Sequence, residues 1–195
     1  MPGARHAAAL ALVLVGGAAA LAPAATFKPR TRTVNDATGD VKNNPMDLVR
    51  VSLGRASNGE LRGSLTAAAA FSTKSMVAKD GIPGSACLRL WTKTKAGGTP
   101  PDYLVCATAD KDGTRLDGSV LQERTGGSPI RVGPAHVSRS NSRNITLRFG
   151  QSRVGKPATI DFAGETTPPG CDRITCTDTA PEDGKVARFR LRQTP

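Results

Sequence analysis

Three aspartates occur close together early in the chain, at positions 36, 40 and 47. Asp36 and Asp40 form a D-x-x-G-D motif around Gly39, and Asp47 stands where a strand is expected to begin. Calcium takes about six to eight oxygen ligands, and a glycine-bent loop between two carboxylates can supply several of them. The spacing is compatible with a structural calcium site, although no cofactor is required. The alternative is that these carboxylates accept backbone hydrogen bonds within turns.

This opening resembles that of secreted bacterial β-sandwich proteins with a DOMON-like or family 9 carbohydrate-binding-module-like architecture. Such proteins often begin with D-x-x-G-D followed by a strand, and the matching residues here are Asp36, Gly39, Asp40 and Asp47. The resemblance covers this opening and the overall strand pattern. It implies a sandwich fold with a structural calcium, and a ligand-binding rather than a catalytic role.

A row of arginines near the end of the chain is a second candidate site. In the last expected strand, Arg188, Arg190 and Arg192 fall on one face, opposite an apolar face. Alternate residues of a strand lie about 6.6 Å apart, so three guanidinium groups could bind a repeating phosphate or carboxylate polymer. The alternative is a solvated sheet face whose charges discourage aggregation.

Trp91 is the aromatic residue best suited to contact a ligand. The expected register places it on the same face as Cys87 and Arg89, and places Tyr103 on the other face. If the face with Trp91 is solvated, its ring is available to a ligand. If a second sheet covers that face, Trp91 belongs to the core, because tryptophans are mostly well buried.

Residues 1–24 are typical of a secretory signal peptide. Arg5 supplies a positive charge, the segment from Ala7 to Ala22 is apolar, and Ala22-Pro23-Ala24 is a small-x-small cleavage pattern. No other segment is apolar enough to suggest a transmembrane helix. We expect a protein that is secreted, either extracellular or loosely associated with the cell envelope.

An oxidising destination favours two disulfides over metal ligands or nucleophiles. Pairing Cys87 with Cys106 sets a hairpin register that also places Leu88 opposite Val105, so the cysteines and the apolar residues align together. Cys171 and Cys176 would close a short loop, although four cysteines allow three connectivities.

The short cysteine loop suggests an alternative function. Arg173 and Ile174 lie between Cys171 and Cys176, where a rigid loop could present a bait to a trypsin-like protease. This alternative makes the protein a secreted protease inhibitor or a protein-interaction domain. Many secreted domains carry such loops only as structural staples.

The elements that position these residues are short strands. Val49, Val51 and Leu53 alternate with polar residues, and Asn58-Gly59 is typical of a tight hairpin turn. About eight or nine short strands without a convincing helix predict an all-β fold, a single antiparallel β-sandwich of jelly-roll or immunoglobulin-like type. The predicted organisation is a signal peptide (1–24), a basic leader (25–35) and one sandwich domain (36–195).

Charge and composition narrow the function. The 195 residues carry 27 basic against 16 acidic side chains, a net charge of +11 that favours anionic partners. Catalysis is disfavoured, because His136 is the one histidine left after the signal peptide and no cofactor motif is present. We expect a non-enzymatic protein that binds an anionic cell-wall polymer or a glycan, with nucleic acid less favoured. The oligomeric state is not predicted.

Overall fold

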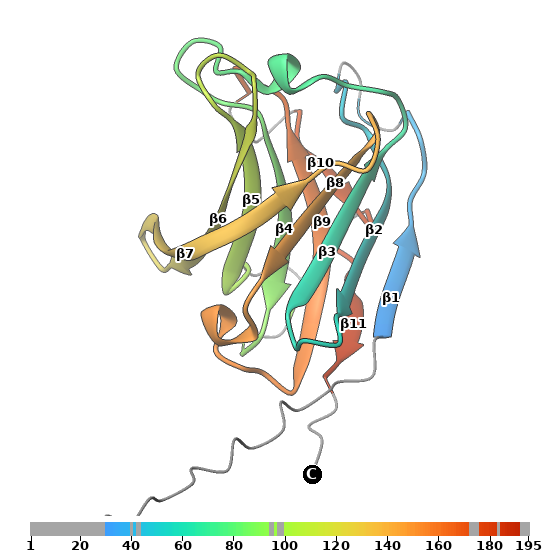
Figure 1. Cartoon of the computed structure of the whole chain (residues 1–195), viewed down its shortest axis with the longest axis vertical. Helices are drawn as coiled ribbons and strands as arrows, with labels where there is room; N and C mark the ends of the chain where they lie inside the picture. Colours follow the sequence, from blue (N-terminus) through green and yellow to red (C-terminus); the bar gives the residue numbers. More distant parts are fainter. Residues whose placement is uncertain are drawn as a thin grey trace, which may run out of the picture.

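The protein is built from antiparallel strands joined by short turns (Figure 1). A computed structural model describes residues 30–39, 41, 44–93, 96, 100–171, 176–182 and 184–191. These ranges contain eleven strands, two short 3-10 helices and no α-helix, and none of their helices is long and apolar enough to cross a membrane. The predicted all-β, antiparallel class is confirmed, with more strands than the eight or nine expected.

The elements follow one another closely along the chain. The strands are β1 (Arg30–Asn35), β2 (Leu48–Arg55), β3 (Leu61–Ala67), β4 (Ser85–Trp91), β5 (Tyr103–Ala109), β6 (Leu116–Arg124), β7 (Gly127–Ser138), β8 (Asn144–Phe149), β9 (Thr159–Thr167), β10 (Asp178–Ala180) and β11 (Ala187–Arg190). The 3-10 helices are η1 (Thr73–Met76) and η2 (Gln151–Val154).

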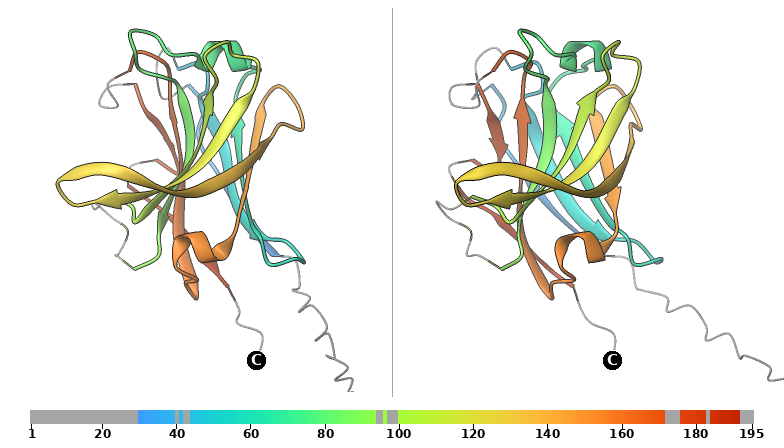
Figure 2. Two further views of the ribbon diagram at one scale, coloured as in Figure 1. Left: turned by 60° about the vertical axis from the view of Figure 1, so that its left-hand side comes forward. Right: turned by 90° about the vertical axis from the view of Figure 1, so that its left-hand side faces the viewer.

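One unbroken path of hydrogen-bonded neighbours runs through the sheet. Its order is β1-β2-β3-β8-β7-β6-β5-β4-β9-β10, and β11 also pairs with β9. The long β7 joins the two halves, because its earlier residues pair with β6 and residues 136–138 pair with β8. The sheet curls into nearly a barrel (Figures 1 and 2). The predicted sandwich, whether jelly-roll or immunoglobulin-like, is not confirmed by this continuous pairing.

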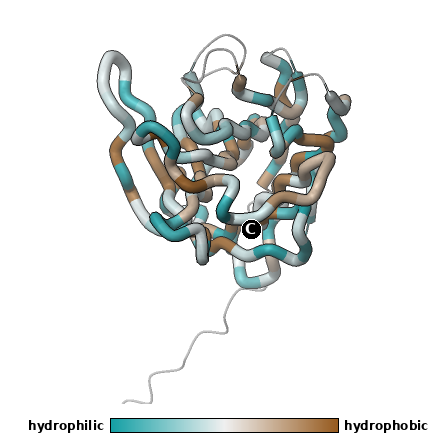
Figure 3. The backbone as a smooth tube through the Cα atoms, turned by 90° about the horizontal axis from the view of Figure 1, so that it is seen from above, coloured by the Kyte–Doolittle hydropathy of each residue, from teal (hydrophilic) through white to brown (hydrophobic). Residues whose placement is uncertain are grey.

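We refer to β1, β2, β3 and β8 as the front strands, and to β4, β5, β6, β9, β10 and β11 as the back strands. The two groups face each other across a single hydrophobic interior. Seen from above, hydrophobic and hydrophilic residues alternate along the strands, as a sheet with one buried face requires (Figure 3). The alternation places most leucine, valine and isoleucine side chains inside. On the outer face of the back strands, Cys87, Leu104 and Cys106 form a second, smaller apolar cluster.

Glycines on facing strands let the two groups approach closely. A Cβ at Gly63 of β3 would overlap Leu88 Cδ1 of β4. A Cβ at Gly164 of β9 would lie 3.1 Å from side-chain atoms of both Leu48 and Leu65. The leucines therefore fill the space that larger residues at these two positions would occupy.

The barrel remains open along one seam. β1 contacts β11, and β2 contacts β10, but no strand pairing joins these elements within the described ranges. β10 and β11 pair with successive parts of β9, so they lie along the same edge of that strand. The seam therefore brings β1 and β11 side by side as two neighbouring sheet edges.

The predicted register of the Cys87–Cys106 hairpin and the predicted hairpin at Asn58-Gly59 are confirmed. Cys87 lies opposite Cys106 and Leu88 opposite Val105, and the cysteines form the expected disulfide. Cys171 and Cys176 form the second one. β2 and β3 form the hairpin predicted around Asn58-Gly59, where Gly59 adopts a φ of 84° that favours glycine.

The predicted basic leader needs a correction. Of residues 25–35, those from Arg30 onward form β1, which pairs with β2 along its whole length. Val34 is the single apolar residue of this strand, so the alternation that reveals a half-buried strand is missing. Backbone hydrogen bonds to β2 hold β1 at the edge of the sheet.

Gly63→Ala tests the close approach of the front and back strands. The added methyl group would force the fully buried Leu88 out of its position, and overpacking of this kind costs about 1–3 kcal/mol. Urea denaturation would measure the loss. Gly127→Ala is the matched control, because its Cβ would have a nearest neighbour at 4.0 Å. Equal stability of the two variants would contradict the proposed packing.

Candidate anion-binding groove

Arginines from opposite ends of the chain line a groove along the seam. The groove has a volume of about 510 Å³ and is lined by Arg30, Thr31, Arg32, Arg188, Phe189 and Arg190. β1 contributes the first three residues and β11 the last three. Four guanidinium groups therefore line one open channel.

Local sequence explains why each strand presents its charges here. In β11, Phe189 is buried in the core and the flanking Arg188 and Arg190 are exposed. In β1, Arg30 and Arg32 are both exposed, because this edge strand has no neighbour beyond it in the sheet. The period of two thus brings alternate arginines of both strands to the groove.

Arg188 forms a two-point ion pair with Asp161 of β9. Its Nε donates to Asp161 Oδ1 at 2.7 Å and its Nη2 donates to Asp161 Oδ2 at 2.8 Å. The hydrogen bond and the charge of Asp161 raise the pKa of Arg188. The Asp161 side chain is 12% exposed and that of Arg188 is 62% exposed, so the arginine reaches solvent from an anchored position. Asp161 thus fixes the guanidinium at the groove wall.

The remaining groove arginines have no such anchor within the described residues. None of the ion pairs seen there involves Arg30, Arg32 or Arg190. An uncompensated cluster of like charges is electrostatically unfavourable, and a bound anion relieves it. The groove is therefore suited to a carboxylate, sulfate or phosphate group.

Charge is distributed unevenly between the two halves of the barrel. The front strands carry six arginines and no Asp or Glu. The back strands carry four arginines and five carboxylates. The groove lies where the two halves meet, so its β1 wall belongs to the strongly positive half. This asymmetry extends the positive potential well beyond the groove.

Trp91 is placed differently from the arginines. Its side chain is only 5% exposed, and the Arg89 guanidinium carbon lies 5.2 Å from the centre of its ring. It lies outside the main hydrophobic core, in register with Asp161. Neither of the two predicted situations applies fully. Within the described ranges no second sheet covers Trp91, yet its ring is buried and does not form a flat binding surface.

The aspartates of the predicted calcium site are only partly described. Asp47 Oδ2 accepts a hydrogen bond from the Gly39 amide at 2.9 Å, the turn role considered as the alternative. Asp40 lies outside the described residues, and within these residues no group of three or more His, Cys, Asp or Glu side chains could hold a metal ion. Because Asp40 belongs to the predicted ligand set, the calcium site stays a prediction.

Two further predictions fall outside the described residues. Arg192 lies beyond the described end of the chain, so the arginine row is seen only at Arg188 and Arg190. Arg173 and Ile174, the predicted protease bait, lie in the undescribed segment between the two bonded cysteines. The alternative function as a protease inhibitor therefore stays a prediction.

The surroundings of His136 bear on catalysis. This histidine is exposed on β7 and lies directly opposite Arg148 of β8. A Ser-His-Asp system needs a carboxylate to orient the imidazole, whereas the cross-strand neighbour here is a cation. Arg148 instead extends the positive front surface beside the histidine.

Sequence reasoning missed the β1 half of the groove. Arg30 and Arg32 were assigned to a leader, and nothing local shows that they meet residues more than 150 positions later. The available signal was the strict alternation of arginine and threonine in RTRTV, which is typical of an exposed edge strand. Which strand edges meet at the seam depends on how far the whole sheet curls, and the local sequence does not reveal this.

Trp91 is the only tryptophan of the chain, so selectively excited tryptophan fluorescence reports the environment of this one side chain. With 5% exposure, we expect little quenching by neutral acrylamide in the folded protein and strong quenching in urea. Arg89→Ala should increase the quenching of the folded protein, because this side chain lies over the ring. A folded wild-type protein quenched as strongly as free tryptophan would contradict the buried position.

Comparisons with known proteins complete the description of the site. No family model, no curated protein and no solved structure matches this chain. The proposals that follow therefore rest on the residues, contacts and charges described above.

Proposed function

We propose that the protein is a secreted, non-enzymatic binder of an anionic polymer of the cell envelope. The observation that carries the proposal is the groove in which four arginines from β1 and β11 converge. Planar guanidinium groups bind carboxylate and phosphate through paired hydrogen bonds. Several such groups along one open channel suit a ligand with repeated charges better than a single ion.

The uneven distribution of charge supports this function further. The front strands carry six arginines and no carboxylate, and the five that are exposed attract anions over a wide surface. If the charged side chains of the front strands served solubility alone, a mixture of positive and negative side chains would serve as well. The back strands, where arginines and carboxylates are mixed, show that pattern.

The aromatic residues argue against recognition of a neutral glycan. Every aromatic side chain of the described residues is at most 9% exposed: Phe71, Trp91, Tyr103, Phe149, Phe162 and Phe189. The described surface therefore offers no Phe, Tyr or Trp ring on which a sugar or an unpaired base could stack, as single-stranded nucleic acid commonly requires. Of the two ligand types considered from the sequence, the anionic one is the better supported.

The proposed location follows from the sequence and agrees with the cysteine chemistry. Residues 1–24, which lie outside the described ranges, have the pattern of a signal peptide. All four cysteines are paired in disulfides, which persist in oxidising compartments. Edman sequencing of the exported protein should begin at Ala25.

Calcium is not needed for the proposed binding.

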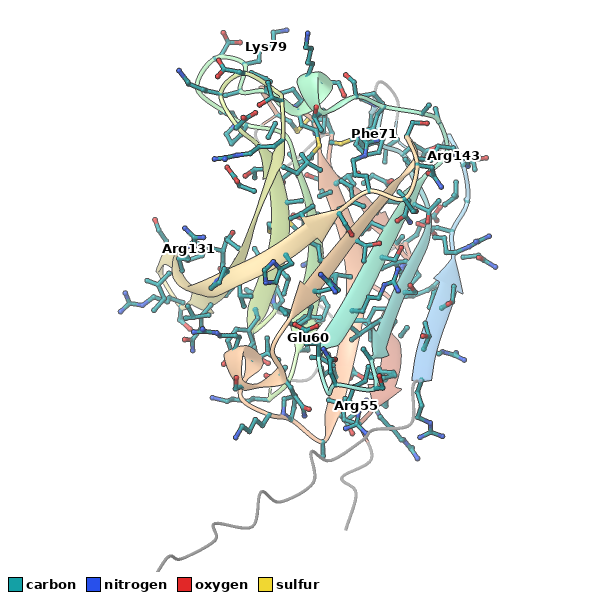
Figure 4. All side chains as sticks on the ribbon, in the orientation of Figure 1. Arg55, Glu60, Phe71, Lys79, Arg131 and Arg143 are labelled. Carbon is teal, nitrogen blue, oxygen red and sulfur yellow. A yellow bond between two sulfur atoms is a disulfide. The ribbon has the colours of Figure 1, made fainter. Side chains whose placement is uncertain are left out.

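Charge removal in the groove tests the function. We expect the double variant Arg32→Gln/Arg190→Gln to bind polygalacturonate, a uniform carboxylate polymer, at least ten-fold more weakly at low salt, because two charged contacts are lost. Titration calorimetry would measure this, and binding by the wild type should weaken as salt rises. Arg131→Gln is the matched control, because this exposed arginine lies on the β6–β7 hairpin, on the side of the molecule away from β1 (Figure 4). Unchanged binding by the groove variant would remove the proposal.

The Arg188 anchor generates a second prediction. Asp161→Asn keeps the shape of the side chain and removes the negative charge beside Arg188. We expect this variant to bind polygalacturonate several-fold more tightly at low salt, since Arg188 then contributes its full charge to the groove. Weaker binding would mean that Asp161 acts mainly by holding Arg188 in position.

A further inference from the structure

We propose that the ligand is a linear acidic polysaccharide that lies across the strands, from the seam groove over β1 and onto the outer face of β2, β3 and β8. This inference rests on the proposed function and specifies the ligand and its path. It depends on a second hollow beside the groove, on a row of aligned residues that includes two opposed arginines, and on one row of hydroxyl groups.

The second hollow begins where the groove ends. Its volume is about 490 Å³, and its lining includes Thr31, Ser52, Gly54, Arg62 and Ser64. Thr31 also lines the seam groove, so the two hollows meet at β1. A polymer that follows this path crosses β1 at Thr31.

The strand registers align a row of residues along this path. Thr31 lies opposite Gly54, Gly54 opposite Arg62, Arg62 opposite Arg148, and Arg148 opposite His136. Opposed residues in antiparallel strands have Cα atoms about 4.5–5.5 Å apart and share one face. Arg62 and Arg148 in this row therefore continue the positive surface away from the groove.

Gly54 keeps the middle of the row low. A Cβ at this position would lie 2.6 Å from the Arg30 carbonyl oxygen and 2.7 Å from Thr31 Oγ1. No side chain can therefore rise between β1 and β3 without moving the edge strand. The row is consequently open from Thr31 to Arg62.

The opposed pair of arginines is itself unfavourable without a ligand. Like charges directly opposite each other across two strands destabilise a sheet. Arg62 and Arg148 are both exposed, and neither belongs to an ion pair within the described residues. An anionic group bridging the two guanidinium groups would relieve the repulsion.

A parallel row of hydroxyl groups distinguishes the class of polymer. Thr33, Ser52, Ser64, Thr146 and Ser138 follow one another in register across β1, β2, β3, β8 and β7. Thr146 is buried, whereas the other four reach the surface at least in part. Hydroxyl groups both donate and accept hydrogen bonds, as the hydroxyl groups of sugars do. Charged and neutral rows side by side suit a sugar chain that carries acidic groups.

The path sets a minimum ligand length. Four strand spacings separate β1 from the end of β7, which amounts to about 19 Å at about 4.8 Å per spacing. The seam groove adds to this length. A disaccharide covers part of the path, and a chain several times longer can contact both hollows at once.

Oligogalacturonates of two, four, eight and twelve sugars provide the test, measured by calorimetry with the secreted wild-type protein. We expect the affinity to rise steeply up to about eight sugars, because contacts in the two hollows then act together. The double variant Arg62→Gln/Arg148→Gln should bind the octamer at least ten-fold more weakly than the wild type. Both side chains are exposed, and thermal unfolding of each variant would verify that it remains folded.

The outcomes separate this inference from the function on which it rests. If the groove variant loses binding but the Arg62/Arg148 variant binds the octamer like wild type, the path across the strands is wrong and the groove function stands. If the groove variant binds every length normally, the proposed function itself fails. Single-stranded DNA or polyphosphate of equal charge that binds more tightly than the octamer would overturn the assignment to a polysaccharide.

Discussion

The features of this protein depend on how far one antiparallel sheet can curl. Gly63 and Gly164 let the front and back strands approach closely, and β7 carries the sheet from one half to the other. The curl brings β1 and β11 into contact without joining them in a hydrogen-bonded pair. A fully closed barrel would have no edge at this place. The groove exists because β1 and β11 do not form the hydrogen-bonded pairing that would close the barrel.

Exposed strand edges usually invite pairing with other chains, and proteins protect them with charge. Arg30 and Arg32 on β1 and Arg190 on β11 meet that requirement. Protection alone would be satisfied by either sign or by a mixture. The concentration of a single sign in the groove, continued by Arg62 and Arg148 on the outer face, adds a capacity to bind anions. One set of residues can therefore serve both purposes.

The sequence predicted best those features that are set by local pairing. The register of Cys87 with Cys106 followed from one hairpin in which the cysteines and apolar residues align together, and the structure has that register. The curl of the sheet could not be predicted from the sequence. It depends on contacts between strands that are distant in the chain, such as the contact of Gly63 with Leu88. The sequence predicted the arginine row at Arg188 and Arg190. It did not predict that Arg30 and Arg32 join them, because β1 lacks the apolar alternation that marks a strand.

Concentrating positive charge on one half of the barrel has a cost in the free protein. Arg62 and Arg148 repel each other across the β3–β8 pairing, and the hydrophobic interior together with the Cys87–Cys106 disulfide must offset that repulsion. Salt screens these exposed charges and equally screens their attraction for a polyanion. Ionic strength therefore acts in opposite directions on the two properties, relieving the strain of the free protein while weakening the complex. A bound polyanion relieves the same repulsion and, because it binds only the folded state, stabilises the fold further.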